Sequence, residues 1–138
     1  MSGINWKRVW LGGLAAGLLS NVLGITGAVL LFGEHAEELH RRMGTTMGPV
    51  EGALHLTTRF VLGLGVVWLY AAVRPRFSAG PRTASLAGLF LWLFTFGFSM
   101  AVTAPLKLHP PQVMALLGVW SLVEMQVVAL GGAWVYRE

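Results

Sequence analysis

The chain of 138 residues contains no cysteine, and charged residues make up only 12% of it. The absence of cysteine excludes disulfides, thiolate metal sites and a cysteine nucleophile. The shortage of charge excludes an ordinary soluble domain, which has about 25% charged residues. Catalytic signatures are missing too: there is no phosphate-binding loop, no H-E-x-x-H motif and no Ser-His-Asp order. The sequence therefore predicts a protein without enzymatic activity.

Long apolar runs are what the chain has instead. Hydrophobic residues make up 55% of it, and the mean hydropathy is +0.66. Four stretches each supply the roughly 20 helical residues that cross a hydrocarbon core of about 30 Å: residues 6–32, 49–73, 83–104 and 111–136. Gly and Pro bound the short connections between them. These features predict an all-α, integral membrane four-helix bundle forming one transmembrane domain over residues 1–138.

The basic residues indicate how such a bundle is oriented. An excess of Lys and Arg marks the cytoplasmic side of a membrane protein. Here the excess falls on the N-terminus, the second connection and the C-terminus, at Lys7, Arg8, Arg74, Arg76, Arg82 and Arg137. We therefore expect a bacterial inner-membrane protein with both termini in the cytoplasm. Because the basic residues lie at segment ends, we expect no nucleic-acid binding and take the lipid bilayer as the chain's surroundings.

The first connection carries its own pattern. The stretch "GEHAEELHRRM", residues 33–43, places Ala36, Leu39 and Met43 on one side and charged residues on the other. This is typical of a short amphipathic helix lying at the membrane interface. Two interpretations stay open: a lid over the polar residues described next, or a solvated connector.

Two charged residues fall in the middle of predicted spans. Arg59 lies roughly 15 Å from Pro49, and Glu124 roughly 20 Å from Pro111 on the same side, at 1.5 Å per residue. A lone charge at that depth costs at least about 2.5–3.5 kcal/mol, and an opposite charge is the simplest remedy. We therefore predict that Arg59 pairs with Glu124 inside the bundle. Polar groups that could complete the pair's hydrogen bonds are Asn21, Ser99 and Thr103.

Glu51 and His55 precede Arg59 at intervals of four residues, which places all three on one helical face. This ladder would lead from the outer surface to the ion pair. It predicts a ligand pocket or relay made by Glu51, His55, Arg59, Glu124, Asn21, Ser99 and Thr103. The alternative is an architectural ion pair that fixes helix register, with Glu51 and His55 simply at the interface.

Histidines raise the question of metals and cofactors. All four, His35, His40, His55 and His109, fall on the outer side in this topology. They are candidate copper or zinc ligands, but their spacing is a weak signal, so no metal site is assigned. A bis-histidine heme requires two deep histidines on different helices, and only His55 lies within a span. The sequence identifies no cofactor.

Two further sequence features concern helix packing within the bundle and contacts with other proteins. Gly13, Gly17, Asn21, Gly24 and Ala28 form a small-residue stripe that favours close helix packing. Gln126 lies on the face of its helix opposite Glu124, where an amide would meet lipid. It therefore predicts a contact with a second copy or with a partner membrane subunit.

The opening "INWKRVWLGGLAAGLLSNVLG" and the block "GLGVVWLYAAVRPRFSAGPRTA" resemble small bacterial four-span inner-membrane proteins of unknown function. These share a W-x-R-x-x-x-G-G start, an Asn in the first helix and a cytoplasmic turn similar to "RPRFGPGPRT". The resemblance implies architecture only. Members of the group carry "N-V-x-E-F" in the first helix where this chain has "NVLGIT", so a carboxylate expected near Asn21 is missing.

Taken together, these patterns favour a membrane protein that binds a small molecule or ion from the outer side, in a buried polar pocket at Arg59 and Glu124. The first alternative is a non-catalytic accessory or structural subunit of a larger membrane complex. A further alternative is a His/Met metal-binding protein that faces the periplasm.

Overall fold

The computed structural model describes residues 3–137, and all regular structure in that part of the chain is helical. Four helical segments are long and apolar enough to cross a membrane: α1 (Trp6–Leu30), α3 (Pro49–Phe77), the run Pro81–Leu106, and α6 (Pro111–Val135). The predicted all-α bundle of four spans is confirmed. The protein is a multi-pass membrane protein.

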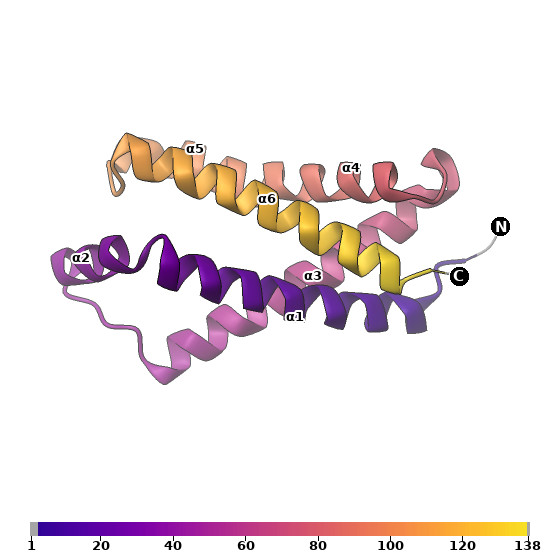
Figure 1. The fold of residues 1–138 in the computed structure, drawn as a ribbon, viewed down its shortest axis with the longest axis horizontal. Coiled ribbons are helices and arrows are strands. Elements are labelled where there is room, and N and C mark those ends of the chain that lie inside the picture. The colour runs from indigo at the N-terminus through magenta and orange to yellow at the C-terminus, as the bar shows by residue number, and fades with distance from the viewer. Residues whose placement is uncertain (1–2, 138) are drawn as a thin grey trace.

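Successive spans run in opposite directions (Figure 1). The start of α1, the α3–α4 connection and the end of α6 therefore lie at one end of the bundle, which we call the terminal end. The α1–α3 connection and the α5–α6 connection lie at the other, which we call the α2 end (Figure 1). This arrangement agrees with the even number of crossings expected from the sequence. Which end faces the cytoplasm stays a prediction.

The third span is not a regular α-helix throughout. It comprises α4 (Pro81–Trp92), the π-helical turn η1 (Leu93–Gly97), α5 (Phe98–Thr103) and the 3-10 turn η2 (Ala104–Leu106). In η1 the N–H of Phe98 bonds to the carbonyl of Leu93, five residues back. The extra residue rotates the following helix by about 100° relative to an uninterrupted one. Side chains after η1 therefore point away from the face that the sequence period predicts.

The first connection forms α2 (Gly33–Met43), so the short amphipathic helix predicted there is confirmed. Arg41 and Arg42 donate to the carboxylate of Glu38 at 2.5 and 2.6 Å. These two bonds hold the pKa of Glu38 below its ordinary value, and the bond from Arg41 contributes more than the bond from Arg42. The helix ends at Gly44, whose φ of 63° lies in the left-handed region that glycine adopts most readily.

Close contact between small residues holds the terminal half of the bundle together. A Cβ added to Gly63 of α3 would lie 2.4 Å from the backbone nitrogen of Gly17 on α1, so these two backbones touch. The small-residue packing predicted for the first helix is therefore confirmed. The buried apolar core of the described residues lies in the same half: Val9, Ala16, Val66, Val67, Tyr70, Ala71, Ala84, Ala87, Met125, Val128, Ala129, Ala133 and Tyr136.

Helix bounds differ from the predicted ones near prolines and at the first turn. α1 ends at Leu30, not at residue 32, because the chain turns there into α2. α3 continues through Pro75 to Phe77, beyond the predicted end at residue 73. Proline lacks an N–H, and in the last turn this removes one bond without ending the helix. α4 begins at Pro81 rather than residue 83, since proline suits the first helical position.

Candidate functional site

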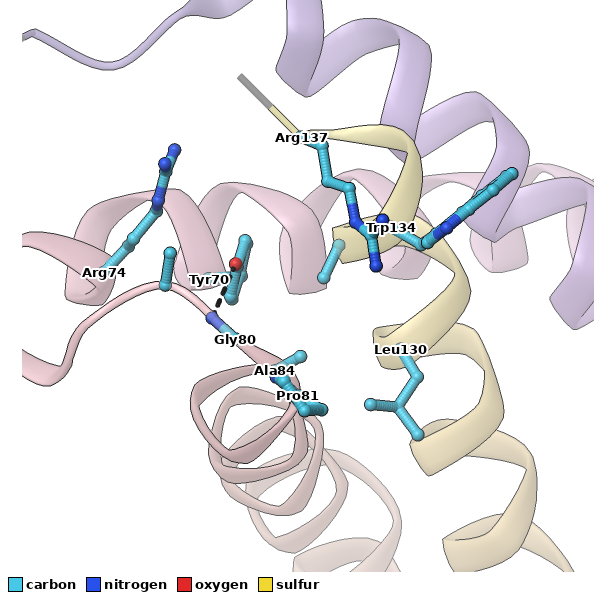
Figure 2. Close-up of a pocket in the computed structure, with 10 residues that line it drawn as sticks. Tyr70, Arg74, Gly80, Pro81, Ala84, Leu130, Trp134 and Arg137 are labelled. Atoms are coloured by element: carbon cyan, nitrogen blue, oxygen red, sulfur yellow. Dashed lines mark hydrogen bonds between the residues drawn. The ribbon is translucent and has the colours of Figure 1, made fainter.

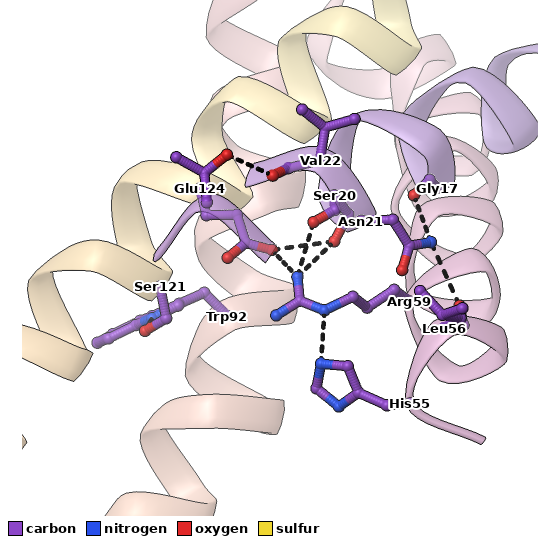
Figure 3. Close-up of polar contacts among 11 residues, drawn as sticks. Gly17, Ser20, Asn21, Val22, His55, Leu56, Arg59, Trp92, Ser121 and Glu124 are labelled. Atoms are coloured by element: carbon purple, nitrogen blue, oxygen red, sulfur yellow. Dashed lines mark hydrogen bonds and ion pairs between the residues drawn. The ribbon is translucent and has the colours of Figure 1, made fainter. Parts of the chain in front are cut away.

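Arg59 of α3 and Glu124 of α6 form an ion pair through Nη1 and Oε1. Their side chains are 13% and 8% exposed, so both are largely removed from the surface. Figure 3 shows the two side chains pointing toward one another. The pairing predicted from their depth is confirmed. Each charge compensates the other in a part of the bundle where either one alone would be costly.

Ser20 of α1 is a third member of this cluster, and sequence reasoning missed it. Its hydroxyl donates to Glu124 Oε1 at 3.0 Å. Arg59 Nη1 in turn donates to the Ser20 carbonyl at 2.8 Å and to its Oγ at 3.1 Å (Figure 3). A signal was present, because alternating intervals of four and three connect the buried small residues Gly13, Gly17, Ser20, Gly24 and Gly27. This stripe runs through Ser20 rather than through Asn21.

The guanidinium of Arg59 has room because residue 24 lacks a side chain. A Cβ on Gly24 would lie 2.1 Å from Arg59 Cζ. On its other side, Arg59 Nε donates to His55 Nε2 at 3.0 Å. That nitrogen must therefore accept, and in this arrangement it carries no proton. His55 and Arg59 are thus connected, as their four-residue spacing predicts.

A cavity of about 350 Å³ adjoins the ion pair on the side of the α2 end. Both charged side chains line it, together with apolar and aromatic groups from α1, η1, α5 and α6. The lining residues are Gly24, Ala28, Phe32, His55, Arg59, Phe96, Met100, His109, Leu117, Trp120, Ser121 and Glu124. Phe96 comes from the π-helical turn, a feature that occurs often at functional sites. The cavity therefore combines an apolar wall with a polar floor.

Glu51 does not reach this cavity. It lines a separate, more open hollow of about 570 Å³ with His40, Leu54 and Thr58. His55 lines both spaces. The predicted ladder is therefore divided: its outer member belongs to one space, the ion pair belongs to the other, and His55 lies between them.

The remaining predicted site residues lie apart from the pair. Asn21 donates its amide to the carbonyls of Gly17 and Leu56 at 3.0 and 3.3 Å. Its Oδ1 is, among the described residues, the one buried side-chain nitrogen or oxygen without a hydrogen-bond partner. The expectation that Ser99 and Thr103 complete the pair's hydrogen bonds is wrong. Thr103 bonds to the Ser99 carbonyl of its own helix at 2.8 Å, because η1 rotates both residues away from the predicted face.

Two histidines meet at the α2 end. His35 Nε2 of α2 lies 2.7 Å from Nδ1 of His109, in the connection that precedes α6. This contact fastens α2 to that connection. Burial, and secondarily the charge of His35, lowers the pKa of His109 from its ordinary value of 6.5. His40 instead contacts Thr45 Oγ1 at 3.0 Å. Within residues 3–137, no three side chains of His, Cys, Asp or Glu gather into a group that could hold a metal ion.

Gln126 has a partner inside the bundle. Its Nε2 donates to the Ser85 carbonyl of α4 at 3.4 Å, and a Cβ on Gly88 would lie 3.3 Å from the same nitrogen. The amide therefore takes part in packing α6 on α4. Gln126 is half-buried, because α4 covers part of that face of α6. The expected contact of Gln126 with a second copy or a partner membrane subunit stays a prediction.

Comparison with known proteins adds one partial similarity. No model of a known protein family matches the chain, and no solved structure matches it. Two curated proteins named "Heme A synthase", from two strains of Methylorubrum extorquens, are 39% and 38% identical to it over 74 residues. The matched stretch is 54% of this chain but 18% of each relative. The chain is thus similar to a small part of these proteins.

Proposed function

We propose that this membrane protein binds a small molecule in the cavity at the α2 end, with Arg59 and Glu124 at its polar floor. The observation that carries the proposal is that the charged pair lines a cavity. A purely architectural ion pair gains from complete enclosure by packed side chains, because a neighbouring void forfeits contacts. An apolar pocket with a few convergent polar groups is, in contrast, the usual form of a ligand site.

The lining indicates the chemistry of the ligand. Phe32, Phe96 and Trp120 offer aromatic surface, whereas the floor offers a guanidinium donor and a carboxylate acceptor. Because the two charges of the floor cancel, the site favours an amphipathic molecule with no large net charge, whose polar group both donates and accepts hydrogen bonds.

Heme is the ligand class that the name of the two relatives raises, and His55 and His109 both line the cavity. His55 Nε2 accepts from Arg59, and His109 Nδ1 contacts His35. An iron would therefore have to be ligated through the other ring nitrogens, His55 Nδ1 or His109 Nε2, because ligation through these two would break an existing contact. An absorbance spectrum of the purified protein tests this class directly, since a bound heme has an intense band in the near ultraviolet.

A cavity-filling substitution tests the proposal. Ala28 lines the cavity, whereas the neighbouring Val29 is 69% exposed on the outside of α1. We expect mass spectrometry of the gently purified protein to find a small molecule enriched over empty detergent micelles. Ala28→Trp is expected to abolish the enrichment, and the matched control Val29→Trp to retain it. Equal retention by both variants, or no enrichment in the unaltered protein, would contradict the proposal.

A subunit of a larger membrane complex is the second candidate. The third span, Pro81–Leu106, buries only 11% of its most apolar window inside the bundle, against 28–39% for the other three spans. Phe90, Phe94 and Phe98 are exposed along it at four-residue intervals. This surface fits either lipid or a partner helix. If the purification above yields a stoichiometric membrane protein and no small molecule, the subunit assignment replaces the first.

A further inference from the structure

The ion pair leaves one atom of each charged group unused. Glu124 Oε1 accepts from Arg59 Nη1 and from the Ser20 hydroxyl, and Arg59 Nε donates to His55. Among the described residues, no group bonds to Oε2 of Glu124 or to Nη2 of Arg59. One hydrogen-bond acceptor and one donor of the pair are therefore left over.

These two atoms open into the cavity at the α2 end. Asn21 Oδ1 is the one buried side-chain nitrogen or oxygen without a partner in the described chain, so Oε2 and Nη2 are accessible. Both charged side chains line the cavity. A Cβ on Gly24, which also lines it, would lie 2.4 Å from Nη2. In Figure 3 both atoms point toward the side on which Ser121, a further lining residue, lies.

A pocket of about 470 Å³ at the terminal end offers a comparison. Figure 2 shows Arg137 beside Trp134 in that pocket, and its guanidinium lies 5.9 Å from the centre of the Trp134 ring. Arg137 is exposed, so water serves the N–H groups that the ring contact leaves. Arg59 and Glu124 are largely removed from the surface, so their unused atoms need a partner inside the cavity.

The two unused atoms are close enough to bind one group of a ligand. Oε2 shares its carboxylate with Oε1, Nη2 shares its guanidinium with Nη1, and Oε1 and Nη1 are in contact. A hydroxyl can donate a hydrogen bond to Oε2 and accept one from Nη2 through a single oxygen. A carboxylate cannot donate, and it would meet the negative charge of Glu124. A carbonyl or an ether can only accept. A hydroxyl is therefore the smallest group that satisfies both atoms.

The cavity wall favours a hydroxyl carried by an aromatic ring. Phe32, Phe96 and Trp120 line the wall, and contacts between rings add to the gain from apolar burial. α1 packs against the Trp120 ring, since a Cβ added to Gly27 would lie 2.3 Å from its Nε1. A phenolic hydroxyl is also more acidic than an aliphatic one, so it donates more strongly to a carboxylate.

We propose that the cavity binds a membrane-soluble phenol, a class that includes the quinols. Its hydroxyl donates to Glu124 Oε2 and accepts from Arg59 Nη2. Its ring lies among Phe32, Phe96 and Trp120. This inference rests on the proposed function, because it names the class of small molecule that the same cavity takes.

Equilibrium dialysis of the full chain in detergent, against empty micelles of the same detergent, tests the class. The probes are 2-naphthol, which can donate and accept, and 2-methoxynaphthalene, which has the same rings but can only accept. At neutral pH we expect saturable enrichment of 2-naphthol on the protein side. 2-Methoxynaphthalene should bind at least about tenfold more weakly, because it loses one hydrogen bond to a charged group.

Two variants locate the bound probe. Ala28→Trp fills the cavity and should abolish the enrichment of 2-naphthol, whereas Val29→Trp lies on the outside of α1 and should retain it. Enrichment that survives Ala28→Trp would place the naphthol elsewhere and overturn the inference. The comparison of the two probes uses the unaltered protein, so it tests the inference even if Ala28→Trp does not fold.

The remaining outcomes separate this inference from the proposed function. Equal affinities for the two probes would show that no donated hydrogen bond is recognised and would overturn the phenol. A loss of both probes in Ala28→Trp would then leave the cavity as a binding site. The phenol would also be overturned if 2-naphthol did not bind and a molecule without a phenolic hydroxyl copurified with the protein. No bound probe together with no copurified molecule would contradict the proposed function as well.

Discussion

The two halves of the bundle are stabilised in different ways. In the terminal half, α1, α3 and α6 touch through glycine and alanine, and the buried apolar core of the described residues lies there. In the α2 half the helices enclose a cavity, and polar contacts at Ser20, Arg59 and Glu124 connect them. The comparison shows how a small membrane protein can contain a cavity. Tight packing in the terminal half stabilises the bundle, so the α2 half does not have to be tightly packed as well.

Removing one member of the ion pair should have the largest effect on stability. Arg59→Met leaves Glu124 as a buried charge without its partner, so we expect a loss of about 3–5 kcal/mol in the free energy of unfolding. The double variant Arg59→Met/Glu124→Met should recover most of that loss, because two apolar groups replace two charges. Unfolding of each variant in mixed micelles measures this cycle. Additive losses in the double variant would show that the two residues do not stabilise one another.

Disturbing the closed half should cost nearly as much. In Gly63→Ala the new methyl group meets the backbone of α1 at 2.4 Å, and backbone cannot yield as a flexible side chain does. We expect a loss of about 3 kcal/mol, at the upper end of typical overpacking. The control is Gly65→Ala, two residues along the same helix, where the nearest atom is 4.0 Å away. Equal stability of the two variants would contradict the description of this half as closed.

Substituting Ser20 should have a smaller effect. Ser20→Ala removes the hydroxyl that donates to Glu124 Oε1, while the Ser20 carbonyl still accepts from Arg59. We expect a loss of about 1–2 kcal/mol in the same unfolding measurement. In the Arg59→Met/Glu124→Met background the effect of Ser20→Ala should nearly vanish, because both hydrogen-bond partners of the hydroxyl are gone. A full effect in that background would assign Ser20 to packing instead.

The contact between His35 and His109 should give the smallest and most local effect, one that depends on pH. Burial lowers the pKa of His109, so the docked state favours its neutral form. Docking of α2 is therefore fully stabilised above pH 6.5, and it weakens as the pH falls from 6.5 toward the lowered pKa. The hydrogen-exchange rate of the α2 amides, corrected for intrinsic rates, should therefore increase as the pH is lowered from about 7.5 to about 5.5. His109→Gln should remove that dependence; an unchanged dependence would assign it to other groups.

The spans and the ion pair could be predicted from the sequence because a large free-energy cost excludes the alternatives in each case. Long apolar runs have no alternative to lipid, and a lone Arg59 or Glu124 in a span would be unstable. It did not predict the contact of His35 with His109, because two connections meet there through tertiary structure. Ser99 and Thr103 were assigned to the wrong face, since the π-helical turn at Leu93–Gly97 leaves no clear mark in the sequence. The hydrogen bond of Gln126 to Ser85 was not predicted either, because the packing of α4 on α6 decides which part of α6 is covered.

Solvent access to single cysteines tests most directly whether one half is open and the other closed. The chain has no cysteine of its own, so each introduced thiol is the only one. Leu117→Cys lines the cavity, Val128→Cys lies in the core at 1% exposure, and Val119→Cys is 62% exposed toward lipid. We predict that a small water-soluble thiol reagent modifies only the cysteine at position 117. If that cysteine is as unreactive as the one at position 128, the cavity does not admit polar molecules, and the proposed binding site is wrong.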